Sequence, residues 1–128
     1  MSEIMLDTCG LIWLVNGGSK ISRKTLEAIE EAKIVYVSAA TALEIGCKTA
    51  IKKLKLPMDA EEWYSKALSI HDLVEIPITG KIALFSASLP LIHKDPADRI
   101  IIATAILNCL PIVTHDSRFD QYSVKVLR

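Results

Sequence analysis

Short apolar segments alternate with longer amphipathic segments along nearly the whole chain, and this alternation limits the folds it can adopt. The apolar segments are typical of strands because they are rich in β-branched residues; they cover residues 4–6, 34–37, 74–76, 111–113 and 124–126. Helices are expected between them, each opening at a residue suited to an N-cap, namely Thr8, Ser22, Ser38, Asp59, Thr79 and Asp95. The alternation predicts an α/β fold, with a parallel sheet and helices on both of its faces.

Length and composition indicate a single domain over residues 1–128. The chain has no repeat or linker, and 51% of its residues are hydrophobic, which is enough for a packed core. Lys plus Arg and Asp plus Glu number 15 each, so binding to nucleic acid must depend on local patches. No signal peptide or membrane-spanning segment is expected. The three cysteines are predicted to be reduced core thiols of a cytoplasmic protein: Cys9, Cys47 and Cys109.

The turn at residues 95–98 has two interpretations. Asp95 precedes a proline, as an N-cap before the first helical position does, and Asp98 then falls at the third helical position. Both carboxylates could simply satisfy free backbone N–H groups and the helix dipole. Both could equally belong to a functional site. The positions of the other acids decide between these interpretations.

Four carboxylates are expected to meet at one pole of the sheet. Asp7 and Asp116 each follow the end of an apolar strand, and Asp98 lies in the first turn of a helix. Strand ends and crossover-helix beginnings gather at the same edge, where ligands bind. Glu44 is two turns into its helix, but helical side chains tilt toward the N-terminus, so it can reach back. Asp95 stands close by as an auxiliary.

Such a cluster needs protons or a cation. Two carboxylates about 5 Å apart repel each other by roughly 3 kcal/mol at an effective dielectric constant of 20. Oxygen ligands without His or Cys at ligand spacing favour Mg²⁺ or Mn²⁺ over zinc, with Asp7, Asp98 and Asp116 as the expected ligands. This chemistry suits attack by a metal-activated water on a phosphodiester.

Residues around the acids fit a polyanionic substrate. Hydroxyl groups that could bind carboxylates or ligand waters are those of Thr8, Ser38, Thr41 and Thr114, with ordinary capping as the alternative. A basic rim for RNA is predicted from Lys48, Lys52, Lys94 and Arg99. Its alternative is a solvated helix face in which Glu44 pairs with Lys48. Structural or surface roles are expected for His93 and His115, and core positions for Trp13 and Trp63.

At these residues the chain resembles PIN-domain proteins, and specifically the VapC-type toxins of bacterial toxin–antitoxin pairs. The resemblance spans nearly the whole length. It covers Leu6-Asp7-Thr8, residues 37–45 with Lys48, residues 54–57, residues 93–105, and Thr114-His115-Asp116 with Phe119 and Tyr122. The turn Asp95-Pro96-Ala97-Asp98-Arg99 is its most specific part. Leu43 departs from the pattern, since similar toxins often carry Trp there; this concerns packing or antitoxin fit rather than the acids.

The resemblance implies a three-layer α/β/α sandwich and Mg²⁺- or Mn²⁺-dependent endoribonuclease activity. Its acidic positions correspond here to Asp7, Glu44, Asp98 and Asp116. It also implies a small cognate antitoxin that covers the site, and a homodimer of the toxin.

Three other functions remain open at this point. A phosphatase of haloacid-dehalogenase type would need a second Asp two residues after Asp7, where this chain has Cys9. A receiver domain would need an Asp after the third strand, where Pro77-Ile78-Thr79 stands instead. A catalytically degenerate PIN fold could serve as a protein-interaction module, although all four acids are present.

Overall fold

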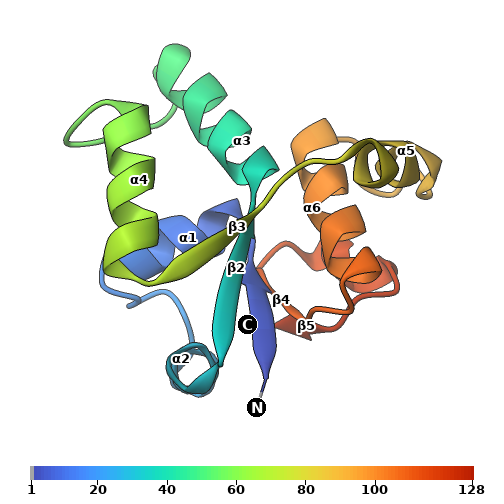
Figure 1. Ribbon diagram of the computed structural model, residues 1–128, viewed down its shortest axis with the longest axis horizontal. Coiled ribbons are helices and arrows are strands. Elements are labelled where there is room, and N and C mark those ends of the chain that lie inside the picture. Colours follow the sequence, from blue (N-terminus) through green and yellow to red (C-terminus); the bar gives the residue numbers. More distant parts are fainter. Residues whose placement is uncertain (1) are drawn as a thin grey trace.

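The computed structural model describes residues 2–128 and has a five-stranded parallel sheet at its centre (Figure 1). The spatial order of the strands is β3-β2-β1-β4-β5, and each neighbouring pair is parallel. Their bounds are β1 Glu3–Leu6, β2 Ile34–Ser38, β3 Leu73–Ile76, β4 Ile112–Val113 and β5 Val126–Leu127. The predicted parallel sheet is confirmed. The last strand starts two residues later than predicted, and it forms one edge of the sheet.

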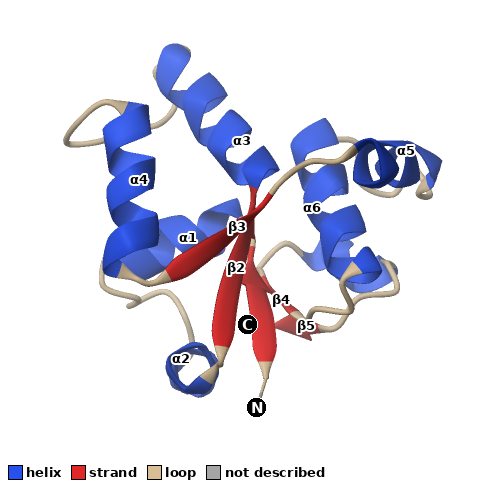
Figure 2. Ribbon diagram, viewed as in Figure 1, coloured by secondary structure: helices blue, strands red, loops and turns tan. Residues whose placement is uncertain are grey.

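Helices cover both faces of this sheet, which makes the fold a three-layer α/β/α sandwich (Figure 2). Helices α1, α2 and α4 lie on one side of the sheet, and α5 and α6 lie on the other (Figure 1). The helices are α1 Thr8–Val15, α2 Arg23–Glu31, α3 Ala39–Ala50, α4 Ala60–Ile70, α5 Gly80–Ser88 and α6 Pro96–Leu107. A short 3-10 helix, η1, spans Ser117–Gln121. No helix in this described stretch is long and apolar enough to cross a membrane.

Alternate residues of the central strands pack into two separate cores. Ile4 and Leu6 of β1 face the core shared with α1, α2 and α4. Met5 between them faces the second core, where it packs with Ile101 and Ile102 of α6. Successive side chains of a strand point to opposite faces, so a strand buried on both sides must be apolar throughout. This explains why the strands read as short continuous apolar runs.

Capping side chains fix where the helices begin. Ser22, Ser38, Asp59, Thr79 and Asp95 each accept a backbone N–H of their helix, as predicted. The first helix differs, because its N-cap is Asp7 and not Thr8. This one-residue difference turns Thr8 into the first helical residue, and its hydroxyl becomes free to bind another side chain.

The cysteines are not core residues, contrary to the prediction. Cys9, Cys47 and Cys109 are free thiols, and all three are exposed. Cys47 lies two positions beyond Ile45, which α3 buries, and a helix turns such a position away from the core. Cys109 lies in the turn after α6 with a φ of 54°. A small apolar residue type therefore did not indicate burial here.

Candidate active site

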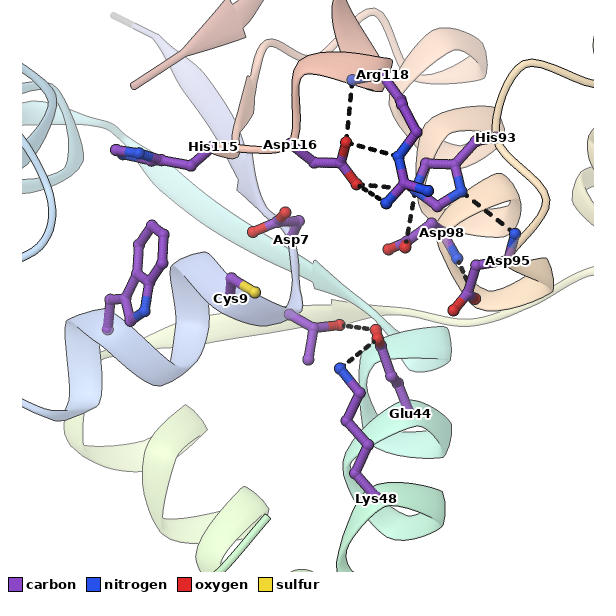
Figure 3. Close-up of a pocket in the computed structure, with 12 residues that line it drawn as sticks. Asp7, Cys9, Glu44, Lys48, His93, Asp95, Asp98, His115, Asp116 and Arg118 are labelled. Atoms are coloured by element: carbon purple, nitrogen blue, oxygen red, sulfur yellow. Dashed lines mark hydrogen bonds and ion pairs between the residues drawn. The ribbon is translucent and has the colours of Figure 1, made fainter. Parts of the chain in front are cut away.

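A cavity of about 420 Å³ opens at the carboxyl ends of the strands (Figure 3). It receives side chains from the β1–α1 junction, α1, α3, the loop before α6, α6 itself and the segment after β4. Four of the lining residues form what we call the acidic cluster, namely Asp7, Glu44, Asp98 and Asp116. The other lining residues are Thr8, Cys9, Trp13, Lys48, His93, Asp95, His115 and Arg118. The predicted convergence of the four acids is thus present in the fold.

Asp7 joins β1 to α1 and lies at the buried centre of the cavity (Figure 3). Its Oδ1 accepts a hydrogen bond of 2.7 Å from the backbone N–H of Gly10. Burial raises the pKa of Asp7 from 3.8 to about 6, and the nearby charges of Glu44 and Asp116 act in the same direction. Asp7 is therefore both a helix cap and a carboxylate that holds its proton unusually well.

The turn at the start of α6 separates its two acids into different roles. Asp95 is the N-cap, and its Oδ1 accepts from the backbone N–H groups of Ala97 at 2.8 Å and Asp98 at 3.2 Å. Asp98 faces the cavity from the third helical position. Partial burial raises its pKa to about 7, with further contributions from the charges of Glu44 and Asp95. The capping interpretation is confirmed for Asp95, whereas Asp98 is available to the site.

Asp116 is the most strongly hydrogen-bonded member of the acidic cluster. The guanidinium of Arg118 donates to both carboxylate oxygens, at 3.0 Å to Oδ1 and 2.8 Å to Oδ2. His93 lies on the other side, with its Nε2 2.9 Å from Oδ2. The side chain of Arg118 is the main reason that the pKa of Asp116 falls to about 2. This carboxylate is therefore ionised at neutral and mildly acidic pH.

Glu44 reaches back from α3 to the cavity, as its position predicts (Figure 3). Its Oε1 accepts a hydrogen bond from the hydroxyl of Thr8, whose oxygen lies 3.3 Å from the hydroxyl oxygen of Thr41 and can accept the proton of that group. Its Oε2 forms an ion pair of 2.9 Å with Lys48, one helical turn further along. Glu44 is thus held from both sides. The predicted Glu44–Lys48 pair is present, and Lys48 also lines the cavity.

The remaining predicted hydroxyl residues hold the backbone beneath the site. Ser38 is fully buried, and its Oγ accepts the backbone N–H of Ala40 at 3.0 Å, so it caps α3. Thr114 is also fully buried and accepts the backbone N–H of Asp116 at 3.0 Å. A hydrogen bond from its side chain partly offsets the raised pKa of Asp7. Neither residue lines the cavity.

Arg99 is not on the basic rim, and its predicted contact with RNA is wrong. The residue is 8% exposed, and its guanidinium points into the protein. Nη1 donates to the carbonyl oxygens of Pro90 and His93 at 2.9 and 3.1 Å, and Nη2 donates to those of Ser86 and Leu89 at 2.8 and 2.7 Å. Arg99 therefore satisfies the carbonyls at the end of α5 and in the loop to α6.

Of the other predicted basic residues, Lys52 and Lys94 are exposed but lie outside the cavity lining. The cavity instead has the guanidinium of Arg118, which was not predicted from the sequence. The spacing of two residues between Arg118 and Asp116 could have indicated an ion pair, because a short turn after a strand can bring two such side chains together. The contact itself depends on the formation of η1, which cannot be read from that spacing.

Trp13 and Cys9 also line the cavity, and both differ from the prediction that they lie in the core. Trp13 is half-buried and meets His115 edge-to-face, with ring centroids 4.7 Å apart, so it borders the cavity rather than lying wholly in the core. Trp63 is buried, as predicted. His93 is 1% exposed and contacts two acids of the cluster. Cys9 is exposed at the edge of the cavity, where desolvation and then the charge of Asp7 raise the pKa of its thiol, which argues against a nucleophilic role.

The site has the donor set of a hard cation. One ligand atom each from His93, Asp98 and Asp116 lies within 4.8 Å of the others, and so does one each from Glu44, Asp95 and Asp98. Asp7 lies in the same cavity but in neither of these groups among residues 2–128. Five carboxylates line the cavity with only Lys48 and Arg118 as its lysine and arginine, so negative charge is in excess among the described residues. Burial, with the neighbouring carboxylates, raises the pKa values of Asp7 and Asp98. Carboxylate oxygens fit Mg²⁺ or Mn²⁺.

A parallel α/β/α sandwich with an acidic cavity at the carboxyl ends of its strands is the architecture of a nuclease-type PIN fold, and the chain belongs to the PIN-domain family, whose profile matches residues 4–125. The chain is 29% identical over 123 residues to Ribonuclease VapC22 of Mycobacterium tuberculosis, covering 95% of this chain and 93% of that protein. This family membership leaves no support for the phosphatase and receiver interpretations.

Solved structures have the same fold. A toxin–antitoxin complex from Klebsiella pneumoniae has 26% sequence identity and a TM-score of 0.67, over 98% of this chain and 96% of that one. VapBC2 from Rickettsia felis, bound to a DNA fragment from its promoter, has 18% identity and a TM-score of 0.70, over 98% and 97% of the two chains. The second likeness concerns the fold alone.

Proposed function

We propose that this chain, as a single PIN domain, is a metal-dependent endoribonuclease that acts in the cytoplasm as the toxin of a toxin–antitoxin pair. The observation that carries the proposal is the acidic cluster, in which the pKa values of Asp7 and Asp98 are raised to about 6 and about 7, mainly by burial and further by the charges of neighbouring carboxylates. Such a site is stabilised by a bound cation. The likeness to Ribonuclease VapC22 over 95% of the chain supports RNA as the substrate.

Asp7, Asp98 and Asp116 are the proposed ligands of Mg²⁺ or Mn²⁺. The bound ion supplies a water of lowered pKa and charge stabilisation at the phosphate. Near neutral pH Asp116 is ionised and Asp7, with a pKa of about 6, is mostly ionised. Asp98, with a pKa of about 7, is protonated in about half of the molecules and must release that proton before it binds a cation. Ion binding and proton release are therefore coupled at this site.

Glu44 is the proposed proton acceptor. Thr8 and Lys48 hold its carboxylate at the cavity, so it can orient the attacking water and accept its proton. Lys48 and Arg118 are the cationic side chains that line the cavity and can meet a phosphate there. Lys52 and Lys94 are exposed outside it and remain available to flanking RNA.

The auxiliary residues act through backbone position. Asp95 caps α6, which carries Asp98, and Ser38 caps α3, which carries Glu44. The caps fix where these helices begin and therefore where the two carboxylates lie. Thr114 holds the backbone of Asp116. We expect substitutions at these three residues to weaken activity through geometry rather than through lost ligands.

The proposed partners are a small cognate antitoxin and a second copy of this chain. The Klebsiella pneumoniae relative is a toxin–antitoxin complex. Large apolar side chains exposed here support a protein-binding surface, and Leu43 beside Glu44 is 56% exposed. A partner that covers Leu43 would lie next to the cavity and block it.

Cleavage of a structured RNA by the purified protein tests the nuclease proposal. Wild type and Lys66→Ala, a control on the exposed Lys66–Glu62 pair of α4, should cleave only with Mg²⁺ or Mn²⁺. Asp98→Asn keeps the shape of the residue but removes its charge, and we expect activity to fall by at least about 100-fold. Cleavage that survives this change, or that needs no divalent ion, would overturn the site assignment. Binding without cleavage by wild type would instead indicate a degenerate interaction module.

Growth tests the toxin role separately. Expression of the wild type should arrest growth, while Asp7→Ala and Asp98→Asn should not, at equal protein levels. Co-expression of a small neighbouring reading frame should restore growth if it encodes the antitoxin. Arrest by all three proteins alike would contradict a toxic nuclease.

A further inference from the structure

His93 occupies a position between two members of the acidic cluster that needs explanation. The residue is 1% exposed and lies in the loop between α5 and α6. Its Nε2 is 2.9 Å from Oδ2 of Asp116 and 3.1 Å from Oδ2 of Asp98 (Figure 3). The same three groups have the spacing of a His–Asp–Asp metal site. Whether the ring donates a proton to the carboxylates or offers a lone pair to a cation depends on which nitrogen is protonated.

The hydrogen bond made by the second ring nitrogen, Nδ1, determines which nitrogen carries the proton. The backbone N–H of Asp95 donates to Nδ1 of His93 at 3.2 Å. A backbone N–H always carries its proton, so the Nδ1 atom that faces it must be the acceptor. The proton of the ring is then on Nε2, which points at two carboxylate oxygens. If Nε2 bound a cation instead, Nδ1 would be the protonated nitrogen, and two donors would face each other.

The ring is also held rigidly in this orientation. The backbone N–H of His93 donates to the hydroxyl of Tyr122 at 2.8 Å. The imidazole meets Phe119 edge-to-face, with centroids 5.7 Å apart and the ring planes at 77°. Phe119 is fully buried and belongs to the core packed under α6. The bond to Tyr122 fixes the backbone that carries the ring, and rotation of the ring would break its contact with Phe119.

We propose that His93 is a positioning residue, whose Nε2–H holds Oδ2 of Asp98 and of Asp116 in the orientation that binds a cation, and that it is not itself a ligand. One N–H shared between two carboxylates ties α6 to the segment after β4, and it keeps the donor set all-oxygen. The inference rests on the proposed metal site, but it makes predictions that do not depend on RNA cleavage.

Imidazole ¹⁵N NMR tests the tautomer directly. The chain has three histidines, and a His93→Gln spectrum assigns the signals of His93. The expected result is a protonated Nε2 and an unprotonated Nδ1, both without a divalent ion and with saturating Mg²⁺. A proton on Nδ1, protons on both nitrogens, or loss of the Nε2 proton when Mg²⁺ binds would each overturn the proposal.

Two substitutions test the positioning role by Mn²⁺ titration calorimetry. His93→Gln keeps an N–H donor at the end of the side chain, whereas His93→Leu has similar bulk and no donor. We expect Mn²⁺ affinity to fall by about 10-fold or more in His93→Leu, in the range of lost ligand-orienting partners, and by less than about 3-fold in His93→Gln. A merely structural role would lower the melting temperature of both without separating their affinities.

Equal affinity loss in the two folded variants, or wild-type affinity in His93→Leu, would contradict the proposal. If His93→Leu does not fold, the wild-type NMR result decides alone. If RNA cleavage is absent while the tautomer and the affinities are as expected, the proposed function fails and the role of His93 stands.

Discussion

Nε2 of His93 lies 2.9 Å from Oδ2 of Asp116, although 23 positions separate the two residues in the chain. The contact joins the loop before α6 to the segment after β4, and the same nitrogen reaches Asp98 on α6 itself. The loop before α6, α6 itself and the segment after β4 are therefore connected through one buried imidazole. A substitution in one of these segments is expected to displace the carboxylates of the others.

When no divalent ion is present, the free energy of unfolding should fall as pH rises from mildly acidic to neutral. Asp7 and Asp98 keep their protons in the folded protein up to about pH 6 and 7, whereas in the unfolded chain they lose them near pH 4. Between these limits the folded state binds more protons, so the free energy of unfolding falls as pH rises from about 4 to about 7. Asp7 alone accounts for roughly 3 kcal/mol at about 1.36 kcal/mol per pKa unit.

Urea unfolding at about pH 5 and pH 8, with a chelator present, measures this effect. Wild type should lose more stability over this interval than Asp7→Asn, which has no proton to release. Saturating Mn²⁺ should remove most of the difference, because the ion takes the place of the protons. Equal stability losses in the two proteins would show that Asp7 does not carry a raised pKa.

The sequence predicted the acids of the site well because each lies at a position that topology alone determines. Asp7 and Asp116 follow strands, and Asp98 opens a helix, so a parallel sheet must bring them to one edge. His93, Arg118 and Trp13 were not predicted as site residues. Their places depend on how loops and η1 pack, and no local periodicity encodes that packing.

Gly10 should be required for the position of Asp7. A Cβ added at Gly10 would lie 3.1 Å from the carbonyl oxygen of Val113 and 3.2 Å from Oδ1 of Asp7. Gly10→Ala should therefore displace the Asp7 carboxylate and lower cleavage by about 10-fold or more. Gly46 is the matched control, because a Cβ there meets no atom within 4 Å. Gly46→Ala should leave activity unchanged and add up to about 1 kcal/mol of stability.

The two alanine variants are compared by initial cleavage rate and by thermal melting. Full activity of a folded Gly10→Ala protein would contradict the close packing of α1 against β4 at this point.

Arg99 should matter for stability and not for RNA. Lysine has a single ammonium group and cannot reach all five carbonyl groups that the guanidinium joins, so Arg99→Lys should cost roughly 3 kcal/mol. Lys94→Met, at an exposed neighbour, should change stability by less than about 0.5 kcal/mol. Denaturant unfolding and RNA binding at low temperature separate the two effects. Weaker RNA binding by a fully folded Arg99→Lys protein would show that Arg99 contacts RNA and would contradict its structural role.

The misassignment of Arg99 has a general reason. A basic residue next to two acids in a turn is easily assigned to the same site. The sequence pattern of the helix does not distinguish a side chain that points to the rim from one that points into the protein. What decides its direction is the group of carbonyl oxygens at Ser86, Leu89 and Pro90, which come together only once α5 ends beside α6. The same holds for the exposed cysteines, whose burial was wrongly predicted from residue type alone.

Cleavage in H₂¹⁸O tests the central claim most directly, namely that water activated at the acidic cluster attacks the phosphodiester. The products of wild-type protein with Mn²⁺ should carry one ¹⁸O atom in the new terminal phosphate, and Asp98→Asn should give no product above background. Products that end in a 2′,3′-cyclic phosphate without ¹⁸O would show that the RNA's own 2′-hydroxyl is the nucleophile and would contradict the account.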